Sequence, residues 1–332
     1  MRKKGLLLTT LLTILLSSVL FWGKAEATQG DTDVQTKEAE SIDFSASMTK
    51  KMTRSGAQEI TIDGDKWDQI VKEAYRKKFP DYTGEIRITD INSGEEITFE
   101  ESFGELDNPL TRARVSAPVT GNPNSSIGKV KLYYFLSDGR VEHGSATAFK
   151  IANDRFATAG HVFYDKEHGY GWAGSGSILL GCTRSKTGGI NTTALYGITQ
   201  QVTNMDWIQT PLQDAWRSDF GHLKVKLYAG KAPANLSILK NPPSRGYGML
   251  YGYNGKVNDV TFSKSSGNLV TSTHNKWFGW LYESSGIQSA PGMSGGPVMN
   301  ASNQVIGIHS NSGNGVSRSV KMSSTVVNAL FK

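Results

Sequence analysis

The stretch Pro291-Gly292-Met293-Ser294-Gly295-Gly296-Pro297 places one serine among glycines near the C-terminal end of the chain. Glycine lets the backbone turn sharply at positions where other residues are strained. Such a turn can bring the N–H groups of Gly292 and Ser294 together on one developing negative charge, while the Ser294 hydroxyl acts as the nucleophile. The stretch therefore predicts a catalytic serine with an oxyanion hole.

A serine nucleophile needs a base and an orienting carboxylate, and two segments further upstream offer them. Residues 156–161 read Phe-Ala-Thr-Ala-Gly-His, which is a strand running into His161. Asp219 precedes the run 220–227, in which apolar residues alternate with others. We therefore expect His161 to take the hydroxyl proton and Asp219 to hold the imidazole, in the chain order histidine, aspartate, serine.

More than one aspartate could supply the orienting carboxylate, because Asp165, Asp206 and Asp214 also lie between the histidine and the serine. Asp219 is preferred since the strand predicted after it would fix its carboxylate. Asp214 is the second choice.

Gly292 to Gly296 also fits the G-x-S-x-G elbow of α/β-hydrolases. That fold needs an acid and then a histidine after the serine. Residues 295–332 contain His309 but no aspartate or glutamate, so this alternative is excluded.

From Val115 onward, short apolar runs alternate with clusters of Gly, Asn and Ser. The runs are 129–136, 146–151, 220–227, 248–253 and 304–309. Regularly spaced short strands predict an all-β barrel or sandwich. Only residues 323–331 show a helical pattern at this end of the chain.

The first residues carry an export signature. A basic head at residues 2–4 is followed by an apolar run from 6 to 21 and by Ala25-Glu26-Ala27. We expect a signal peptide over residues 1–27, cut after Ala27, rather than a membrane anchor. With Cys182 as the only cysteine there is no internal disulfide, and we interpret Cys182 as a buried or incidental thiol. A secreted protein without disulfides suits a Gram-positive bacterium.

Residues 28–114 differ from the rest in charge and pattern. They carry 12 Lys/Arg and 19 Asp/Glu, whereas residues 115–332 carry 20 and 10, which predicts electrostatic complementarity between the two parts. Residues 28–60 lack hydrophobic periodicity and are expected to be flexible, whereas 65–78 predicts a helix and 86–99 a short hairpin. A small folded pro-segment is preferred over a plain spacer. Nucleic-acid binding is not favoured, because the cations are scattered.

Residues 115–332 resemble trypsin-like serine proteases, and more narrowly the bacterial glutamyl endopeptidase branch that includes the exfoliative toxins. The likeness is best over Ser289 to Val298, followed by Val305 to Ser310. It implies two six-stranded antiparallel β-barrels, one from 115 to about 230 and one from about 240 to 322, with the active site between them. It implies no cofactor and no metal.

The resemblance also implies roles for residues outside the triad. In that branch, a histidine at the place of His309 lines the primary pocket and pairs with a substrate glutamate. Ser289, five residues before the nucleophile, helps His309 to bind the substrate glutamate. The new amino group of Val115 would join them after cleavage at Arg114-Val115, and Ser310 would support Asp219.

The sequence departs from the branch in three ways. Met293 stands where the branch commonly has a polar residue, and Gly296 stands where it frequently has a serine. The number of residues between His161 and Asp219 along the chain is also large for the branch. An inserted loop near 169–189 is therefore expected.

The function expected is that of a secreted, monomeric serine endopeptidase that is made as a zymogen and cuts protein or peptide substrates after Glu, with Asp as the alternative residue. A separate Arg-cutting protease would activate it, and no membrane association would remain after signal cleavage. Three alternatives stay open: a toxin-like protease with a narrow protein target, an inactive binding protein on the same fold, and a protease with Lys/Arg preference.

Overall fold

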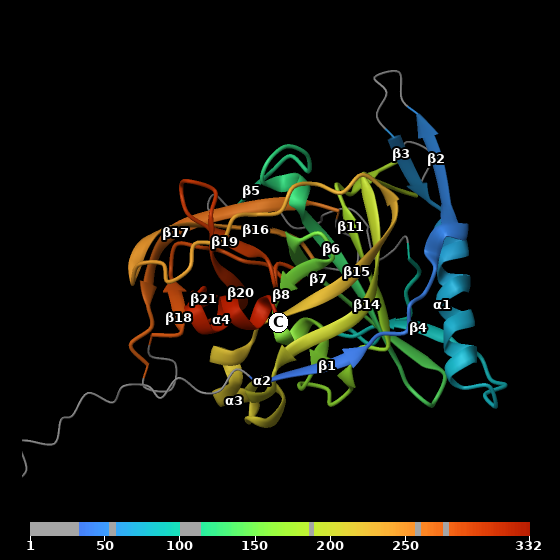
Figure 1. Cartoon of the computed structure of the whole chain (residues 1–332). Helices are drawn as coiled ribbons and strands as arrows, with labels where there is room; N and C mark the ends of the chain where they lie inside the picture. The colour runs from blue at the N-terminus through green and yellow to red at the C-terminus, as the bar shows by residue number, and fades with distance from the viewer. Residues whose placement is uncertain (1–32, 53–57, 100–113, 186–188, 256–259, 275–278) are drawn as a thin grey trace, which may run out of the picture. The chain divides into compact units, whose positions relative to one another are not determined.

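Two antiparallel β-barrels of six strands each dominate the computed structural model, which describes residues 33–52, 58–99, 114–185, 189–255, 260–274 and 279–332 (Figure 1). In pairing order, the strands of the first barrel are β6 (Ile127–Phe135), β7 (Arg140–Ala152), β8 (Arg155–Thr158), β15 (Gly221–Gly230), β14 (Ala194–Asn204) and β11 (Ser175–Leu180). Those of the second are β16 (Arg245–Tyr253), β19 (Pro297–Met299), β20 (Val305–Gly313), β21 (Val316–Lys321), β18 (Leu281–Ser284) and β17 (Phe262–Thr271). Each ring closes on itself, through β11–β6 and β16–β17, so the predicted two-barrel fold is confirmed.

The helix predicted at the C-terminal end is α4 (Ser324–Leu330). The Ser323 hydroxyl begins it by accepting a hydrogen bond from the Val326 N–H at 3.3 Å. Among the described segments, every helix is too short or too polar to span a lipid bilayer.

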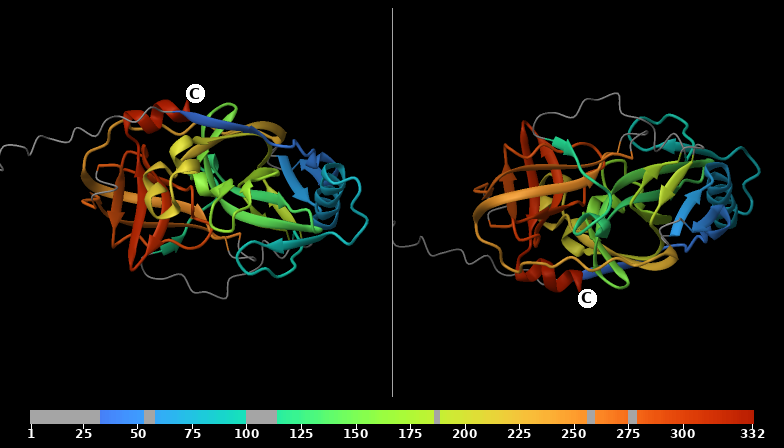
Figure 2. Two further views of the ribbon diagram at one scale, coloured as in Figure 1. Left: turned by 90° about the horizontal axis from the view of Figure 1, so that it is seen from below. Right: turned by 90° about the horizontal axis from the view of Figure 1, so that it is seen from above.

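The N-terminal segment adds two strands to the first barrel's sheet and two to a separate four-stranded sheet. Its elements are β1 (Val34–Glu38), η1 (Phe44–Ser47), β2 (Met48–Met52), β3 (Gln58–Ile62), α1 (Gly64–Lys78) and β4 (Arg87–Asp90). β1 pairs with β14 over five residues, and β4 pairs in parallel with β7. Both views of Figure 2 show α1 on the flank of the first barrel that faces away from the second.

The prediction that residues 28–60 are flexible is therefore wrong over the described part, 33–52 and 58–60. β1 is polar and four of its five residues are exposed, so it has no apolar period. Its backbone pairing with β14 needs none.

The helix predicted at 65–78 is confirmed as α1, and Asp63 caps its first turn. The hairpin predicted at 86–99 is short: it comprises the bridge between Thr89 and Glu96 and the hydrogen bond from Ile97 N to Ile88 O at 2.8 Å.

The remaining short elements connect the barrel strands. They are β5 (Arg114–Ser116), η3 (Asn124–Ser126), η4 (Gly160–Val162), β9 (Tyr164–Asp165), β10 (Gly171–Trp172), β12 (Thr183–Arg184), β13 (Ile190–Thr192), α2 (Met205–Gln209), α3 (Leu212–Ala215) and η5 (Trp216–Ser218).

The loop insertion expected at 169–189 is wrong in extent, because β11 within it is a barrel strand. The chain lies outside the barrel before β11, where β10 pairs with β9, and again after it, where β12 and β13 pair with each other and β13 pairs with β3.

Candidate active site

The pairing of β8 with β15 places the predicted base beside the predicted acid. His161 lies in η4 just after β8, and Asp219 lies just before β15. Because Thr158 and Gly221 are opposite each other in this antiparallel pair, the end of one strand meets the start of the next. His161 Nδ1 lies 2.8 Å from Asp219 Oδ2, and the His161 backbone N–H donates to Asp219 Oδ1, also at 2.8 Å.

The Asp219 carboxylate is fully buried and has a third donor. The Ser310 hydroxyl, from β20 of the other barrel, donates to Asp219 Oδ2 at 2.5 Å. A buried carboxylate is costly unless donors surround it. Ser310 therefore lies where the resemblance placed it, and this contact joins the two barrels at the site.

The other three aspartates have different partners. Asp165 accepts hydrogen bonds from the backbone N–H groups of His168 and Tyr170. Asp206 lies 3.8 Å from Arg217, and Asp214 lies in α3. In the described part of the chain, the ring of His161 is hydrogen-bonded to Asp219 and to none of these.

Two opposing effects act on the His161 ring. Burial lowers the pKa of His161, but the Asp219 carboxylate and its hydrogen bond outweigh this, so the pKa lies above its usual value. About 29% of the side chain is still exposed, which leaves an edge open toward the cleft. The ring is therefore suited to accept a proton and hold it as an imidazolium.

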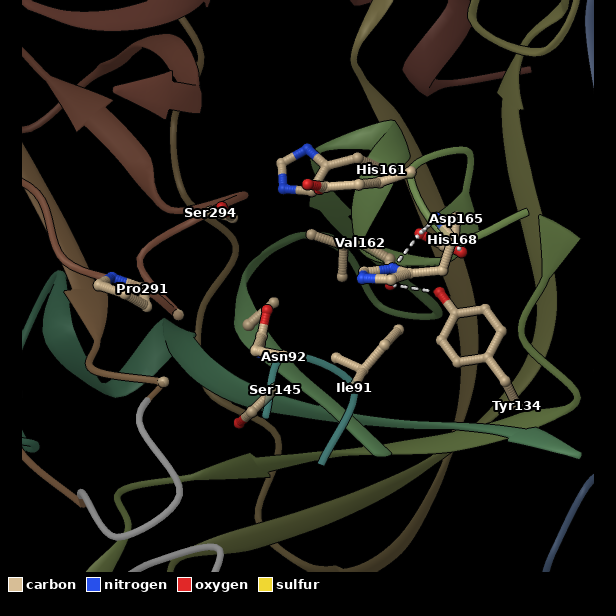
Figure 3. A pocket seen from close by; sticks show the side chains of 15 residues that line it. Ile91, Asn92, Tyr134, Ser145, His161, Val162, Asp165, His168, Pro291 and Ser294 are labelled. Carbon is tan, nitrogen blue, oxygen red and sulfur yellow. Dashed lines mark hydrogen bonds and ion pairs between the residues drawn. The ribbon is translucent and has the colours of Figure 1, made fainter. Parts of the chain in front are cut away.

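Ser294 sits in a turn that only glycine can complete. Gly295 has φ +78°, and a Cβ there would meet Thr158 Oγ1 at 1.9 Å and Thr147 O at 2.3 Å. The turn is anchored in the first barrel, since Thr147 N donates to Ser294 O at 2.9 Å. Ser294 and His161 line one pocket (Figure 3).

The Ser294 hydroxyl makes one long hydrogen bond, to the Ser310 carbonyl at 3.5 Å. No hydrogen bond joins it to His161 within the described residues. Hydrogen bonds of this kind often tighten only when substrate binds.

The residues before Ser294 form a type II turn, the geometry that sets the direction of the Gly292 N–H. Met293 N donates to Ala290 O at 3.1 Å, Pro291 takes the second position, and Gly292 follows with φ +85°. The Pro291 carbonyl accepts a hydrogen bond from the Gly255 N–H at 2.5 Å. Since C=O and N–H point in opposite directions in a trans peptide, the Gly292 N–H faces away from Gly255.

A series of contacts through two further serines, Ser317 and Ser312, connects His309 with Ser289. His309 is 2% exposed on β20, and its Nδ1 lies 3.4 Å from the Ser317 hydroxyl. Ser317 pairs with Ser312 across β20 and β21, and Ser312 Oγ lies 2.5 Å from Ser289 Oγ. Burial, helped by the nearby His161, lowers the pKa of His309 to about 4, so this ring is neutral near pH 7.

Val115 does not contact His309 in this uncut chain. β5 pairs with β17, and Val115 is 46% exposed there. Its neighbour Arg114 lies opposite Ser265, whose hydroxyl accepts from the Gln288 N–H at 2.8 Å. The predicted junction is thus one strand from the segment that leads into Ser289. Ala27 lies outside the described residues.

Several site residues escaped sequence reasoning. Gly255, Ser312 and Ser317 belong to no motif, and only the alternation of serines along β20 and β21 hints at the last two. Cys182 is buried as interpreted, and burial raises the pKa of its thiol to about 12, which keeps it protonated.

Comparison with known proteins agrees with this geometry. Residues 146–308, which include His161, Asp219 and Ser294, match the family described as the trypsin-like peptidase domain. The chain carries a trypsin-like peptidase domain. No curated protein matches the sequence.

Two solved structures share the fold of this trypsin-like domain. A Glu endopeptidase in complex with MPD is 20% identical, with a TM-score of 0.52, and the match covers 65% of this chain and 94% of that one. The protease Anisep from Arthrobacter nicotinovorans is 14% identical, with a TM-score of 0.51, and the match covers 65% and 96%. At these identities the likeness concerns the fold alone.

Proposed function

We propose that this trypsin-like protein is a secreted serine endopeptidase, made as a zymogen, that cuts peptide bonds after glutamate. The observation that carries the proposal is the hydrogen bond of 2.8 Å between the buried Asp219 and His161, which lines one pocket with Ser294. An imidazole held in this way is the base that a serine nucleophile needs.

The proposed reaction proceeds through an acyl-enzyme. His161 takes the Ser294 proton while the hydroxyl oxygen attacks the scissile carbonyl carbon. The N–H groups of Gly292 and Ser294 stabilise the oxyanion, and His161 then gives its proton to the leaving amine. Water, activated by the same imidazole, hydrolyses the ester. Asp219 stays ionised and stabilises the imidazolium throughout.

The preference for glutamate rests on His309, Ser289, Ser312 and Ser317. A substrate carboxylate needs hydrogen-bond donors when it leaves water. One histidine N–H and three hydroxyls supply donors without a permanent charge. The ammonium group of a new N-terminus at Val115 would add the missing positive charge, which is the proposed reason for activation by cleavage after Arg114.

The test compares the uncut chain beginning at Thr28 with the same chain cut before Val115. Short peptides with Glu, Asp, Arg or Phe before the scissile bond serve as substrates, and Ser294→Ala is the control. We expect cleavage after Glu only by the cut form. Equal activity of both forms would remove the role of the new amine, and a preference for Arg would overturn the assignment of the pocket.

A further inference from the structure

The pocket beside Ser294 is lined in part by the N-terminal segment. Ile91 and Asn92 line it together with Ser145, His161 and Ser294 (Figure 3). They follow directly after β4, and the Ile91 N–H donates to His143 O on β7 at 3.0 Å. Asn92 is exposed, and its backbone N–H donates to Asp90 at 2.9 Å, which fixes the turn.

This part of the pocket lies on the leaving-group side of the proposed cleft. The residues predicted to bind the glutamate, His309 and Ser289, do not line it. Its lining instead surrounds His161 with Val162, Asp165, Glu167 and His168. Because His161 must donate its proton to the leaving amine, residues after the scissile bond have to lie on its side of Ser294.

Strand pairing holds the segment in place. β1 pairs with β14 over five residues, β3 with β13 over three, and β4 with β7 over four. Each of these pairings is made by backbone hydrogen bonds, which do not depend on particular side chains.

Buried aromatic side chains of the segment strengthen this attachment. Trp67 Nε1 donates to the Tyr133 hydroxyl at 2.7 Å, and Gly139 N donates to the Tyr75 hydroxyl at 2.9 Å. Trp67 stacks on Phe44 with ring centroids 3.7 Å apart, and all four aromatic side chains are at most 1% exposed. None of these contacts includes the bond between 114 and 115, so cutting that bond removes none of them.

We propose that residues 33–99 stay bound to residues 115–332 after cleavage, as the second chain of a two-chain enzyme, and that the Ile91–Asn92 turn forms part of the binding site for substrate residues beyond the scissile bond. This rests on the proposed function, and it makes the segment that was predicted as a pro-segment a part of the mature enzyme. The segment is then a permanent part of the substrate cleft.

Limited digestion with an Arg-cutting protease, checked by N-terminal sequencing at Val115, tests retention. We expect both fragments to elute together on size exclusion and to separate only in denaturant. Separate elution under native conditions would overturn the proposal, whether or not the larger fragment is active.

The role of the turn is tested with Asn92→Trp and a matched control, Lys77→Trp, at an exposed position on α1. Two substrates are compared, one with a small chromogenic amine after Glu and one with three residues after Glu. In Asn92→Trp the ratio of kcat/KM for the long substrate to that for the small one should fall about tenfold relative to the parent. The control ratio should stay as in the parent. An unchanged ratio in Asn92→Trp would contradict the placement of the turn.

Failure of the proposed function gives a different result. In that case the small substrate is not cleaved by the parent at all, while co-elution of the fragments is unaffected.

Discussion

Gly255→Ala is expected to disable the oxyanion hole from outside the catalytic motif. A Cβ at this position would lie 2.3 Å from Gly292 Cα and 2.6 Å from Gly292 N. Both are backbone atoms, so the peptide between Pro291 and Gly292 has to move by roughly an ångström to restore ordinary contact. That movement breaks the 2.5 Å hydrogen bond from Gly255 N to Pro291 O, which orients the peptide.

The size of the effect follows from the donor that is displaced. Loss of one oxyanion donor lowers kcat by about 10²–10³. We expect a decrease of this size in kcat for a short Glu substrate, with a change in KM of less than about threefold, because the peptide that Gly255 contacts is not among the residues proposed to bind the substrate glutamate. Steady-state kinetics on the cut chain measures both constants.

Gly246→Ala is the matched control. It lies on β16, close before Gly255 in the chain, and a Cβ there would meet nothing within 4 Å. Its kcat should equal that of the parent. A Gly255→Ala enzyme with kcat within about threefold of the parent would refute the proposal that this contact orients the oxyanion hole.

Three further changes probe the base, the pocket and the N-terminal segment. Because Asp219 holds the pKa of His161 above its usual value and the base works only when neutral, kcat/KM should rise with pH through a midpoint above 6.5. Asp219→Asn should move that midpoint to lower pH and lower kcat by about 10⁴, as a full pH profile would reveal. His309→Ala should lower the ratio of kcat/KM for Glu over Gln peptides by roughly 10–100-fold, and an unchanged ratio would place the pocket elsewhere. Trp67→Ala should lower the free energy of unfolding by about 3–5 kcal/mol, measured with urea, and a loss below about 1 kcal/mol would mean that the segment is not part of the folded core.

The β-rich fold and the glycine-rich turn at Ser294 could be predicted because their signals are local, whereas the arrangement in two barrels came from the resemblance. Apolar residues alternate in 220–227 because one face of that strand is buried, and glycines surround Ser294 because the turn there needs them. The strand 221–230 pairs with the strand that ends just before His161. The choice of Asp219 over Asp214 also followed from the strand after it. Ser310 had no local signal and came from the resemblance alone.

The attachment of the N-terminal segment could not be predicted because it depends on distant backbone groups. β1 reads Val-Gln-Thr-Lys-Glu and pairs through N–H and C=O groups that every residue carries. β4 is only four residues long, and its partner β7 lies about 50 residues further along the chain. Gly255 likewise depends on a close approach to Gly292 that no spacing in the sequence encodes.

If His161, Asp219 and Ser294 act together on the Ser294 hydroxyl, the rate at which a fluorophosphonate labels Ser294 depends on His161. Intact-mass analysis of the cut chain should show one adduct per molecule, placed on Ser294 by peptide mapping. His161→Ala should slow its formation at least about a hundredfold. Labelling at another residue, or at an unchanged rate in His161→Ala, would show that these three residues do not form a catalytic triad.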